Sequence, residues 1–321
     1  MKPFPLKAQP WLGLDIGGTK IEALVVNDQD QVLGQAIVPT ATATPDHLCQ
    51  SISAAATQAL TQAQSDFTQV AAVGMGIPGQ VNPDTGEVTL AVNLNLSNFP
   101  LGAVLSHAWG KPCFLENDVR AAAVGAYFHL IQPSPLTPPA SALRHIAYLS
   151  IGTGIAAGII LDGRLHRGAN GMAGEVGHIP LDLAGERCAC GQTGCLETIA
   201  AGPAIVRQAA QVGLKVSHAG EVYAAASHGH PQAQAIIQRV SLSLGRAIQW
   251  LIMTCDVEKV VLGGGVTRSG ATFLEPICHA LAQLRAHSPL AQTLLATDKI
   301  TLIPPGFNAG VWGAIALARQ K

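Results

Sequence analysis

The sequence predicts a two-lobed α/β protein whose halves are similar. Each half opens with a strand hairpin that turns through a glycine-rich segment, residues 15–20 in the first half and 151–154 in the second. Alternating strand and helix patterns follow each hairpin, which is the order expected of an α/β fold. The chain has 321 residues, of which 48% are hydrophobic. It is therefore long enough to form two domains with a core in each.

Apolar runs that end at glycine, proline or polar residues predict the strands of both halves. In the first half we expect strands at 11–15, 21–26, 32–38, 70–77 and 111–115, with a short pair around Val81 and Val88. In the second half we expect them at 146–151, 155–161, 257–262 and 301–303. In each half the first strands form a meander joined by glycine turns.

Five segments predict helices, at 45–64, 119–130, 204–212, 231–255 and 310–319. The first has Thr44 as its N-cap and Pro45 at its first position. Residues 132–141 contain four prolines and are expected to form a surface loop between the lobes. We expect an N-terminal lobe of residues 1–118 closed by the C-terminal helix 309–321, and a C-terminal lobe of residues 119–308 with an inserted segment at 175–197.

Composition argues against several classes of protein. The net charge is −1 and aromatic residues make up 4%, so neither a basic patch nor a base-stacking surface for nucleic acid is expected. Residues 1–10 lack the apolar run of a signal peptide, and the uncharged stretch 146–161 is too short for a membrane helix. We expect a cytoplasmic protein in which Cys49, Cys113, Cys255 and Cys278 are ordinary reduced thiols.

Potential metal ligands gather near the middle of the chain. They are His178, Cys188, Cys190 and Cys195. Three thiolates and one imidazole make a closed tetrahedral set, so this pattern predicts a structural zinc ion. Gly191 and Gly194 would let the backbone turn tightly around it. Two carboxylates that the metal does not need, Glu175 and Glu197, flank the set and indicate a polar small-molecule site beside it. The second nitrogen of the His178 ring could donate a hydrogen bond to a sugar hydroxyl.

Three glycine segments are candidates for binding a nucleotide. The first contains Asp15, Gly17, Gly18, Thr19 and Lys20, the second Gly152, Thr153 and Gly154, and the third Gly263, Gly264 and Gly265. Each could be only a tight turn. Alternatively, the amides of the first two turns could bind polyphosphate oxygens, while Asp15 orients magnesium through water. The third could let a base or ribose approach the backbone.

The segment Glu116-Asn117-Asp118 stands between a strand and a helix. Asn117 or Asp118 could merely cap the helix. An acid at the carboxyl end of a strand also lies where α/β sheets place ligands. Asp118 could accept the proton of a hydroxyl whose oxygen attacks a phosphate, and Asn117 could hold a neighbouring hydroxyl. The glycine-rich segment 74–79, likewise, is either a tight bend or bare backbone facing a ligand.

Together these segments resemble the ROK family of sugar kinases and repressors, within the actin/hexokinase/Hsp70 superfamily. The resemblance spans residues 11–319, and its most specific part is the pattern Gly174-Glu175-x-x-His178 followed by Cys188-x-Cys190-Gly-x-x-Gly-Cys195-x-Glu197. It implies a two-lobed actin-like ATPase fold (ribonuclease H-like), with a mixed sheet and helices in each lobe and a cleft between them that closes on substrate. Ala156 and Ala157 depart from the Gly-Gly of many members, and residues 93–101 lack a tryptophan often found there.

The resemblance also implies roles for individual residues. Asp118 would be the general base toward the 6-hydroxyl of a hexose. The hexose would be bound by Gly79, Asn117, Asp118, Glu175, His178 and Glu197. Zinc would be held by His178, Cys188, Cys190 and Cys195. ATP with magnesium would bind the three glycine segments, and a homodimer would be common.

Three hypotheses about function follow. The first is an ATP-dependent hexose kinase, with glucose as the expected hexose and N-acetylmannosamine or N-acetylglucosamine as alternatives that the motifs do not separate. The second is a sugar-responsive transcriptional repressor, which we disfavour because about ten residues precede the first strand and no basic helix is visible. The third is a sugar-binding protein without catalysis, which the retained Asp15, Thr19, Asn117 and Asp118 argue against.

Overall fold

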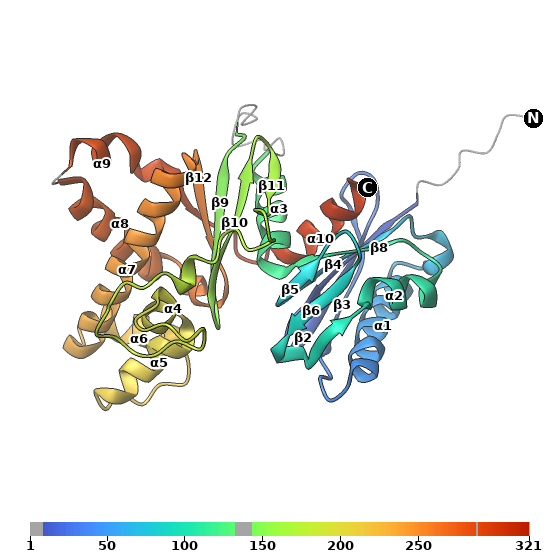
Figure 1. Cartoon of the computed structure of the whole chain (residues 1–321), viewed down its shortest axis with the longest axis horizontal. Helices are drawn as coiled ribbons and strands as arrows, with labels where there is room; N and C mark the ends of the chain where they lie inside the picture. The colour runs from blue at the N-terminus through green and yellow to red at the C-terminus, as the bar shows by residue number, and fades with distance from the viewer. Residues whose placement is uncertain (1–8, 132–142, 287, 321) are drawn as a thin grey trace, which may run out of the picture. The chain divides into compact units, whose positions relative to one another are not determined.

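The computed structural model describes residues 9–131, 143–286 and 288–320. Two compact units are present: residues 1–139 with 308–321 form the first, and residues 140–307 form the second (Figure 1). The boundary expected after residue 118 is wrong, because helix α3 (Asp118–Ile131) packs against α10 (Ala309–Arg319) in the first unit. The proline-rich segment 132–141, expected to be a loop, lies outside the described residues.

The first unit is built on a five-stranded mixed sheet of order β3-β2-β1-β4-β8. The strands are β1 (Trp11–Ile16), β2 (Lys20–Val26), β3 (Val32–Pro39), β4 (Val73–Ile77) and β8 (Cys113–Asn117). The first three form an antiparallel meander, whereas β1, β4 and β8 run parallel. Because parallel strands end at the same edge of a sheet, Asp15 and Asn117 lie at one edge.

Three short strands and two further helices complete the first unit. They are β5 (Gln80–Asn82), β6 (Glu87–Ala91), β7 (Leu96–Phe99), α1 (Pro45–Gln62) and α2 (Leu101–Trp109). The predicted N-cap of α1 is confirmed, since the Thr44 side chain accepts a hydrogen bond from the His47 amide. The strand expected over 70–77 begins at Val73, because the 3-10 helix Phe67–Gln69 precedes it.

Helix α10 packs closely against the sheet and against α3 because glycines lie at both contacts. A Cβ added at Gly74 on β4 would lie 1.8 Å from the Ala314 carbonyl oxygen. One added at Gly125 on α3 would lie 2.0 Å from the Ala309 oxygen. Side chains at these positions would push α10 away, so the glycines fix the N-terminus of α10 beside the end of β1.

The second unit repeats the strand order of the first, as β11-β10-β9-β12-β13. Its strands are β9 (Ile146–Ile151), β10 (Ile155–Leu161), β11 (Arg164–His166), β12 (Lys259–Gly263) and β13 (Ile300–Leu302). Again the first three form an antiparallel meander and β9, β12 and β13 run parallel. The prediction of a mixed sheet with helices in each half is confirmed.

Six helices complete the described part of the second unit. They are α4 (Leu196–Ala200), α5 (Gly202–Gln211), α6 (Ala219–Ser227), α7 (Pro231–Cys255), α8 (Ala271–Ala286) and α9 (Pro289–Leu294). Helix α7 has the predicted bounds, whereas α4, α6, α8 and α9 were not predicted. A single apolar core lies beneath them and includes Tyr223 and Phe273. Within the described ranges, every helix is too short or too polar to cross a bilayer.

Candidate active site

Two carboxylates lie at the strand-end edge of the first unit. Asp15 belongs to the end of β1, and Asp118 begins α3 directly after β8. The pKa of Asp15 is raised to about 6, chiefly by burial and also by the charge of Asp118, whereas a hydrogen bond from Asn308 Nδ2 (3.1 Å) opposes this. Burial also raises the pKa of Asp118, against the lowering effect of the Val119 amide and the Arg120 charge. A carboxylate with a raised pKa is the better proton acceptor.

Asn117 both caps α3 and orients Asp118. Its Nδ2 donates to the Gly79 carbonyl oxygen at 3.1 Å and to Asp118 Oδ1 at 3.0 Å. Its Oδ1 accepts the amides of Val119 and Arg120, each at 3.1 Å. The capping and the functional interpretations of this segment are therefore compatible, because the cap itself holds the carboxylate in place.

An ion pair that the sequence analysis missed supports the β8–α3 junction. Arg120 Nε donates to Glu116 Oε1 at 2.8 Å, and the same oxygen accepts the Asn117 amide at 3.0 Å. Both charged side chains are buried, so loss of either partner would remove a compensating charge from a buried group. The local pattern gave little signal for this pair, because Glu116 lies on a strand and Arg120 on the following helix, and the i,i+4 rule applies within one helix. This pair restrains the backbone that carries Asn117 and Asp118.

The segment after β4 requires glycine for structural reasons. Gly79 has a φ of 101°, and a Cβ there would lie 2.2 Å from the Leu90 carbonyl oxygen. A Cβ at Gly76 would lie 3.2 Å from the Ala121 side chain and 3.9 Å from Asp15 Oδ1. The bare backbone allows the chain to pass close to Asp15 and to present the Gly79 carbonyl to Asn117.

The first glycine turn joins β1 to β2 and is largely exposed. The Gly17 amide donates to the Lys20 carbonyl at 2.9 Å, and Gly18 and Thr19 lie at the surface. A Cβ at Gly18 would meet its nearest neighbour, Asn93, only at 3.8 Å. The backbone is thus open on this side, as binding of an anion by successive amides requires.

The second glycine turn is bound to Glu197. Glu197 Oε2 accepts the Ile155 amide at 2.9 Å, and a Cβ at Gly154 would lie 2.6 Å from the same oxygen. The Gly152 amide donates to the Gly154 carbonyl at 2.9 Å, and Thr153 at the tip is exposed. The absence of a side chain at Gly154 therefore leaves room for a carboxylate that was predicted to bind sugar. Glu197, which was assigned to the hexose, therefore accepts a hydrogen bond from the glycine turn that was assigned to phosphate.

The third glycine segment follows β12 and enters the 3-10 helix η4 (Gly265–Ser269). A Cβ at Gly263 would lie 2.2 Å from the Tyr148 hydroxyl, and Gly264 has a φ of 93° with the Ile151 carbonyl 2.4 Å from its Cβ position. Packing alone thus requires these two glycines. Gly265 has no neighbour within 4 Å of its Cβ position, so it leaves space for a ligand.

The histidine and cysteines of the central segment come together in the second unit. One ligand atom from each of His178, Cys188, Cys190 and Cys195 lies within 4.8 Å of all the others. His178 Nδ1 is 3.6 Å from Cys188 Sγ, and Cys190 Sγ is 3.6 Å from Cys195 Sγ. The three sulfurs and one nitrogen are compatible with a closed structural zinc site. Because Nδ1 faces the cluster, Nε2 of the same ring is left for another partner.

Glycines also shape the loop that carries the cysteines. The Gly191 amide donates to the Cys188 carbonyl at 2.9 Å, with a φ of 93° at Gly191. A Cβ at Gly194 would lie 1.6 Å from the Asp182 carbonyl oxygen. Both turns place sulfurs toward the cluster. Glu175 is exposed and directly precedes the 3-10 helix η3 (Val176–His178), which ends with His178.

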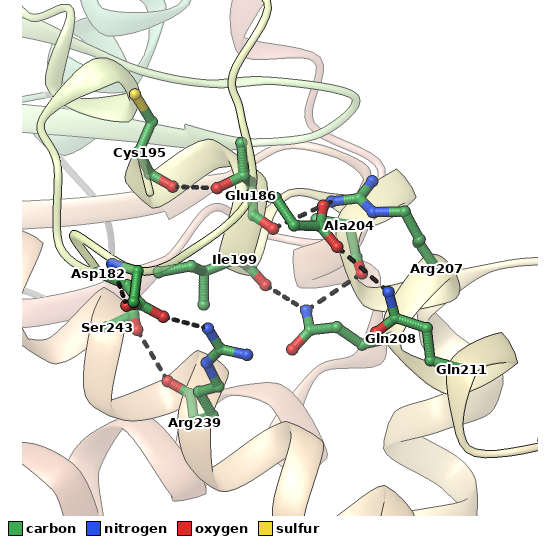
Figure 2. A network of polar contacts seen from close by, with 12 residues as sticks. Asp182, Glu186, Cys195, Ile199, Ala204, Arg207, Gln208, Gln211, Arg239 and Ser243 are labelled. Atoms are coloured by element: carbon green, nitrogen blue, oxygen red, sulfur yellow. Dashed lines mark hydrogen bonds and ion pairs between the residues drawn. The ribbon is translucent and has the colours of Figure 1, made fainter. Parts of the chain in front are cut away.

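Ion pairs attach this loop to two helices (Figure 2). Arg239 of α7 donates to Asp182 at 2.8 Å. Arg207 of α5 pairs with Glu186, which also accepts a hydrogen bond from Gln211 at 3.2 Å. These residues could not be identified from the sequence, because nothing in the local pattern joins residues 57 positions apart, as Asp182 and Arg239 are. They restrain the loop between His178 and the cysteines.

The sequence matches the model of the ROK family over residues 11–321. The chain therefore belongs to the ROK family. A glucokinase from Halalkalibacterium halodurans is 30% identical over 83% of each chain. An N-acetylmannosamine kinase from Citrobacter koseri is 34% identical over 85% of this chain and 88% of that protein.

Solved structures agree with this assignment. A ROK glucokinase from Streptomyces griseus in complex with glucose and AMPPNP has a TM-score of 0.75 at 30% identity, covering 97% of this chain and all of that one. A ROK transcriptional regulator, a homologue of the E. coli MLC protein, has a TM-score of 0.80 at 26% identity, covering 98% of this chain and 78% of that one. The expected actin-like α/β fold is confirmed.

Proposed function

We propose that the chain is an ATP-dependent hexose kinase that phosphorylates the 6-hydroxyl of a hexose, with glucose as the preferred substrate. The observation that supports this most directly is the β8–α3 junction, where Asn117 holds the carboxylate of Asp118 and burial raises its pKa. The similarity to a glucokinase, and to a glucokinase solved with glucose and a nucleotide, agrees with this assignment.

In the first unit, Asp118 would accept the proton of the 6-hydroxyl as that oxygen attacks the terminal phosphorus of ATP. The bond from that phosphorus to the bridging oxygen breaks, and ADP leaves. Asn117 and Gly79 would contact the hexose. Asp15 would orient magnesium through water, and the amides of the first glycine turn would bind phosphate oxygens. The open backbone at Gly18 supports this last role.

In the second unit, the carboxylates of Glu175 and Glu197 and the Nε2 atom of His178 would bind hexose hydroxyls. The second glycine turn would bind phosphate, and the third glycine segment would bind adenosine. We propose that zinc is held by His178, Cys188, Cys190 and Cys195, all four of which the structure brings together. With four protein ligands the ion would act as a scaffold, with no open position for a substrate.

A hexose panel tests this assignment. Purified protein is assayed for ADP release with ATP, magnesium and glucose, mannose, N-acetylmannosamine or N-acetylglucosamine in turn. We expect kcat/KM to be highest for glucose. A higher value for N-acetylmannosamine would favour the second candidate, which the 34% identity to such a kinase supports. The kinase proposal is wrong if no hexose is turned over at millimolar concentration.

We also propose that the protein is a homodimer, on the basis of its family resemblance. Light scattering of the purified chain gives the mass directly, and the mass of a single chain would contradict the proposal. A repressor function is the less favoured alternative. Specific binding to DNA together with an absence of phosphorylated hexose would support it instead of the kinase.

A further inference from the structure

The short helix α4 is attached to the second glycine turn on both sides of the turn. Near the start of the helix, Glu197 Oε2 accepts the amide of Ile155, the residue that follows the turn, at 2.9 Å. Beyond the end of the helix, the Gly202 amide donates to the carbonyl oxygen of Gly152 at 2.8 Å. The exposed Thr153 lies between these two attachments. The path of residues 152–155 is therefore held by α4 and the residue that begins α5.

The Glu197 carboxylate has one oxygen bound to the protein and one oxygen left for a ligand. Oε2 accepts the Ile155 amide, whereas Oε1 has no hydrogen-bond partner among the described residues. A carboxylate can accept hydrogen bonds at both oxygens. A hexose hydroxyl that donates to Oε1 would meet a carboxylate whose orientation is already set by the turn, and such preorganisation lowers the entropic cost of binding.

Gly154 leaves the space that this carboxylate occupies. A Cβ at Gly154 would lie 2.6 Å from Glu197 Oε2 and 3.5 Å from Glu197 Cδ. Apart from the chain neighbours of Gly154, no other described atom lies within 4 Å of this Cβ position. The φ of Gly154 is outside the left-handed region, so the backbone would accept alanine without strain. An alanine at this position would therefore act by displacing the Glu197 side chain.

The other glycine of the same turn lacks this contact. A Cβ at Gly152 would have the Gly265 amide nitrogen as its nearest neighbour, at 3.9 Å, which is an ordinary contact. The φ of Gly152 is also outside the left-handed region. Both substitutions reduce the freedom of the unfolded backbone in the same way. Alanine at 152 and alanine at 154 therefore differ in whether they move Glu197.

The start of α4 is fixed by the segment that carries the proposed zinc ligands. Cys195 is the N-cap of α4, and its Sγ lies 3.3 Å from the His178 carbonyl oxygen. The next amide, of Leu196, donates to the Ile179 carbonyl oxygen at 3.0 Å. Glu197 follows directly, so its backbone is held in place before its side chain reaches the turn.

We propose that Glu197 is a positioning residue for the second glycine turn as well as a hexose ligand, so that hexose binding and phosphate binding in the second unit depend on one carboxylate. This inference rests on the proposed function, which assigns Glu197 to the hexose and the turn to phosphate. Oε1 binds the hexose, while Oε2 holds the amide that sets the path of residues 152–155. A change at either site therefore alters binding at the other, as reciprocal coupling requires.

Nucleotide binding in the absence of hexose tests one direction of this coupling. ADP with magnesium is titrated into the full chain by calorimetry. Glu197→Ala should bind it at least about fivefold more weakly than the wild type, which is the lower end of coupling between two sites. Glu197→Gln should bind it with nearly the wild-type affinity, because the amide oxygen can still accept from Ile155. The matched control is Glu175→Ala, which should bind ADP like the wild type, because the Glu175 side chain has no hydrogen-bond partner among the described residues.

Hexose binding in the absence of nucleotide tests the other direction. The hexose with the highest kcat/KM in the panel is titrated into the full chain. Gly154→Ala should bind it at least about fivefold more weakly, although residue 154 is assigned to phosphate, because the new Cβ displaces the Glu197 carboxylate. Gly152→Ala is the matched control and should bind this hexose like the wild type.

Four results would overturn the inference. They are wild-type affinity for ADP in Glu197→Ala, equal weakening of ADP binding in Glu197→Gln and Glu197→Ala, equal hexose affinity in Gly154→Ala and Gly152→Ala, and no binding of millimolar ADP by the wild type. Failure of the proposed function is recognised separately, because the wild type then turns over no hexose of the panel. Turnover by the wild type together with any of the first three results refutes the coupling alone.

Discussion

The two units share one strand order but differ in the chemistry at their first hairpin. β1 and β9 occupy the same central position in their sheets. The fifth residue of β1 is Asp15, whereas the fifth residue of β9 is Ser150. The first unit thus carries its carboxylate on the strand itself. In the second, the carboxylate beside the turn is Glu197, which comes from α4 and lies 42 residues after the amide it binds.

This difference leads us to expect different chemical roles for two units of the same topology. In the first unit, burial raises the pKa values of Asp15 and Asp118, and perturbed pKa values are common at functional sites. In the second unit, one histidine and three cysteines come together in the segment between Glu175 and Glu197. We therefore expect changes in the first unit to lower kcat and changes in the second unit to weaken hexose binding.

The largest effect is expected at Asp118. Asp118→Asn keeps the shape of the side chain but removes the proton acceptor, so kcat should fall by about 10²–10⁴. Hexose binding should persist, because Asn117 and the loop of Gly79 remain. Steady-state kinetics and hexose titration of the variant measure both quantities. Asp84→Asn, an exposed aspartate of the same unit, is the control. Near-normal turnover in Asp118→Asn would exclude the general-base role.

A smaller and different effect is expected from the second unit. Cys190→Ser should reduce the bound zinc, and the KM for hexose should rise about 10- to 100-fold because Glu175 and His178 lose their support. The kcat at saturating hexose should change less than it does in Asp118→Asn. Metal analysis and kinetics measure the two quantities. Cys255→Ser lies outside the cluster and serves as the control. Unchanged hexose affinity in zinc-free protein would contradict the scaffold role.

The strands could be predicted because their signal is local. β1, β9 and α7 follow directly from apolar runs and helix-start residues. Helix α8 could not, because Pro276 in its interior normally indicates the end of a helix. The boundary between the units was also misplaced, since the packing of α3 on α10 depends on glycines whose neighbours lie far along the chain, such as Ala309 near Gly125.

The candidate site shows the same limit. Residue type and spacing identified Asp118, Asn117 and the cysteine cluster without any structure. Contacts between distant residues could not be predicted, and they include the hydrogen bond from the Ile155 amide to Glu197 and the ion pair between Asp182 and Arg239. Each of these contacts joins two segments that lie far apart in the sequence, and only the folded structure brings the segments together.

The difference between Asp15 and Ser150 can be tested through the pH dependence of the free energy of unfolding. Its pKa is raised from 3.8 to about 6, so the folded state holds this proton more tightly than the unfolded state. Stability should therefore fall as the pH rises from about 4 to about 6 and stay constant above, as proton linkage requires. Asp15→Asn should remove the part of this dependence that Asp15 contributes and leave the part that follows from the raised pKa of Asp118. It should raise the free energy of unfolding at pH 7 by about 1–2 kcal/mol, less than the full shift because a buried amide also costs free energy.

Denaturant unfolding at several pH values measures this effect. Ser150→Asn, at the equivalent position of the second unit, is the matched control and should leave the pH dependence unchanged. An Asp15→Asn variant that is less stable than the wild type at pH 7, with the same pH dependence, would show that burial does not raise the pKa of Asp15.

The smallest effect is expected from the ion pair between Arg239 and Asp182, which is partly exposed. Exposed pairs contribute about 0–1 kcal/mol, so Arg239→Gln should raise the KM for hexose by no more than about fivefold. Because salt screens such pairs, the difference from the wild type should shrink at high ionic strength. Arg246→Gln, exposed on the same helix, should have no effect on KM. An equal change in both variants, or one that persists at high salt, would mean that Arg239 does not act by holding the cysteine loop through Asp182.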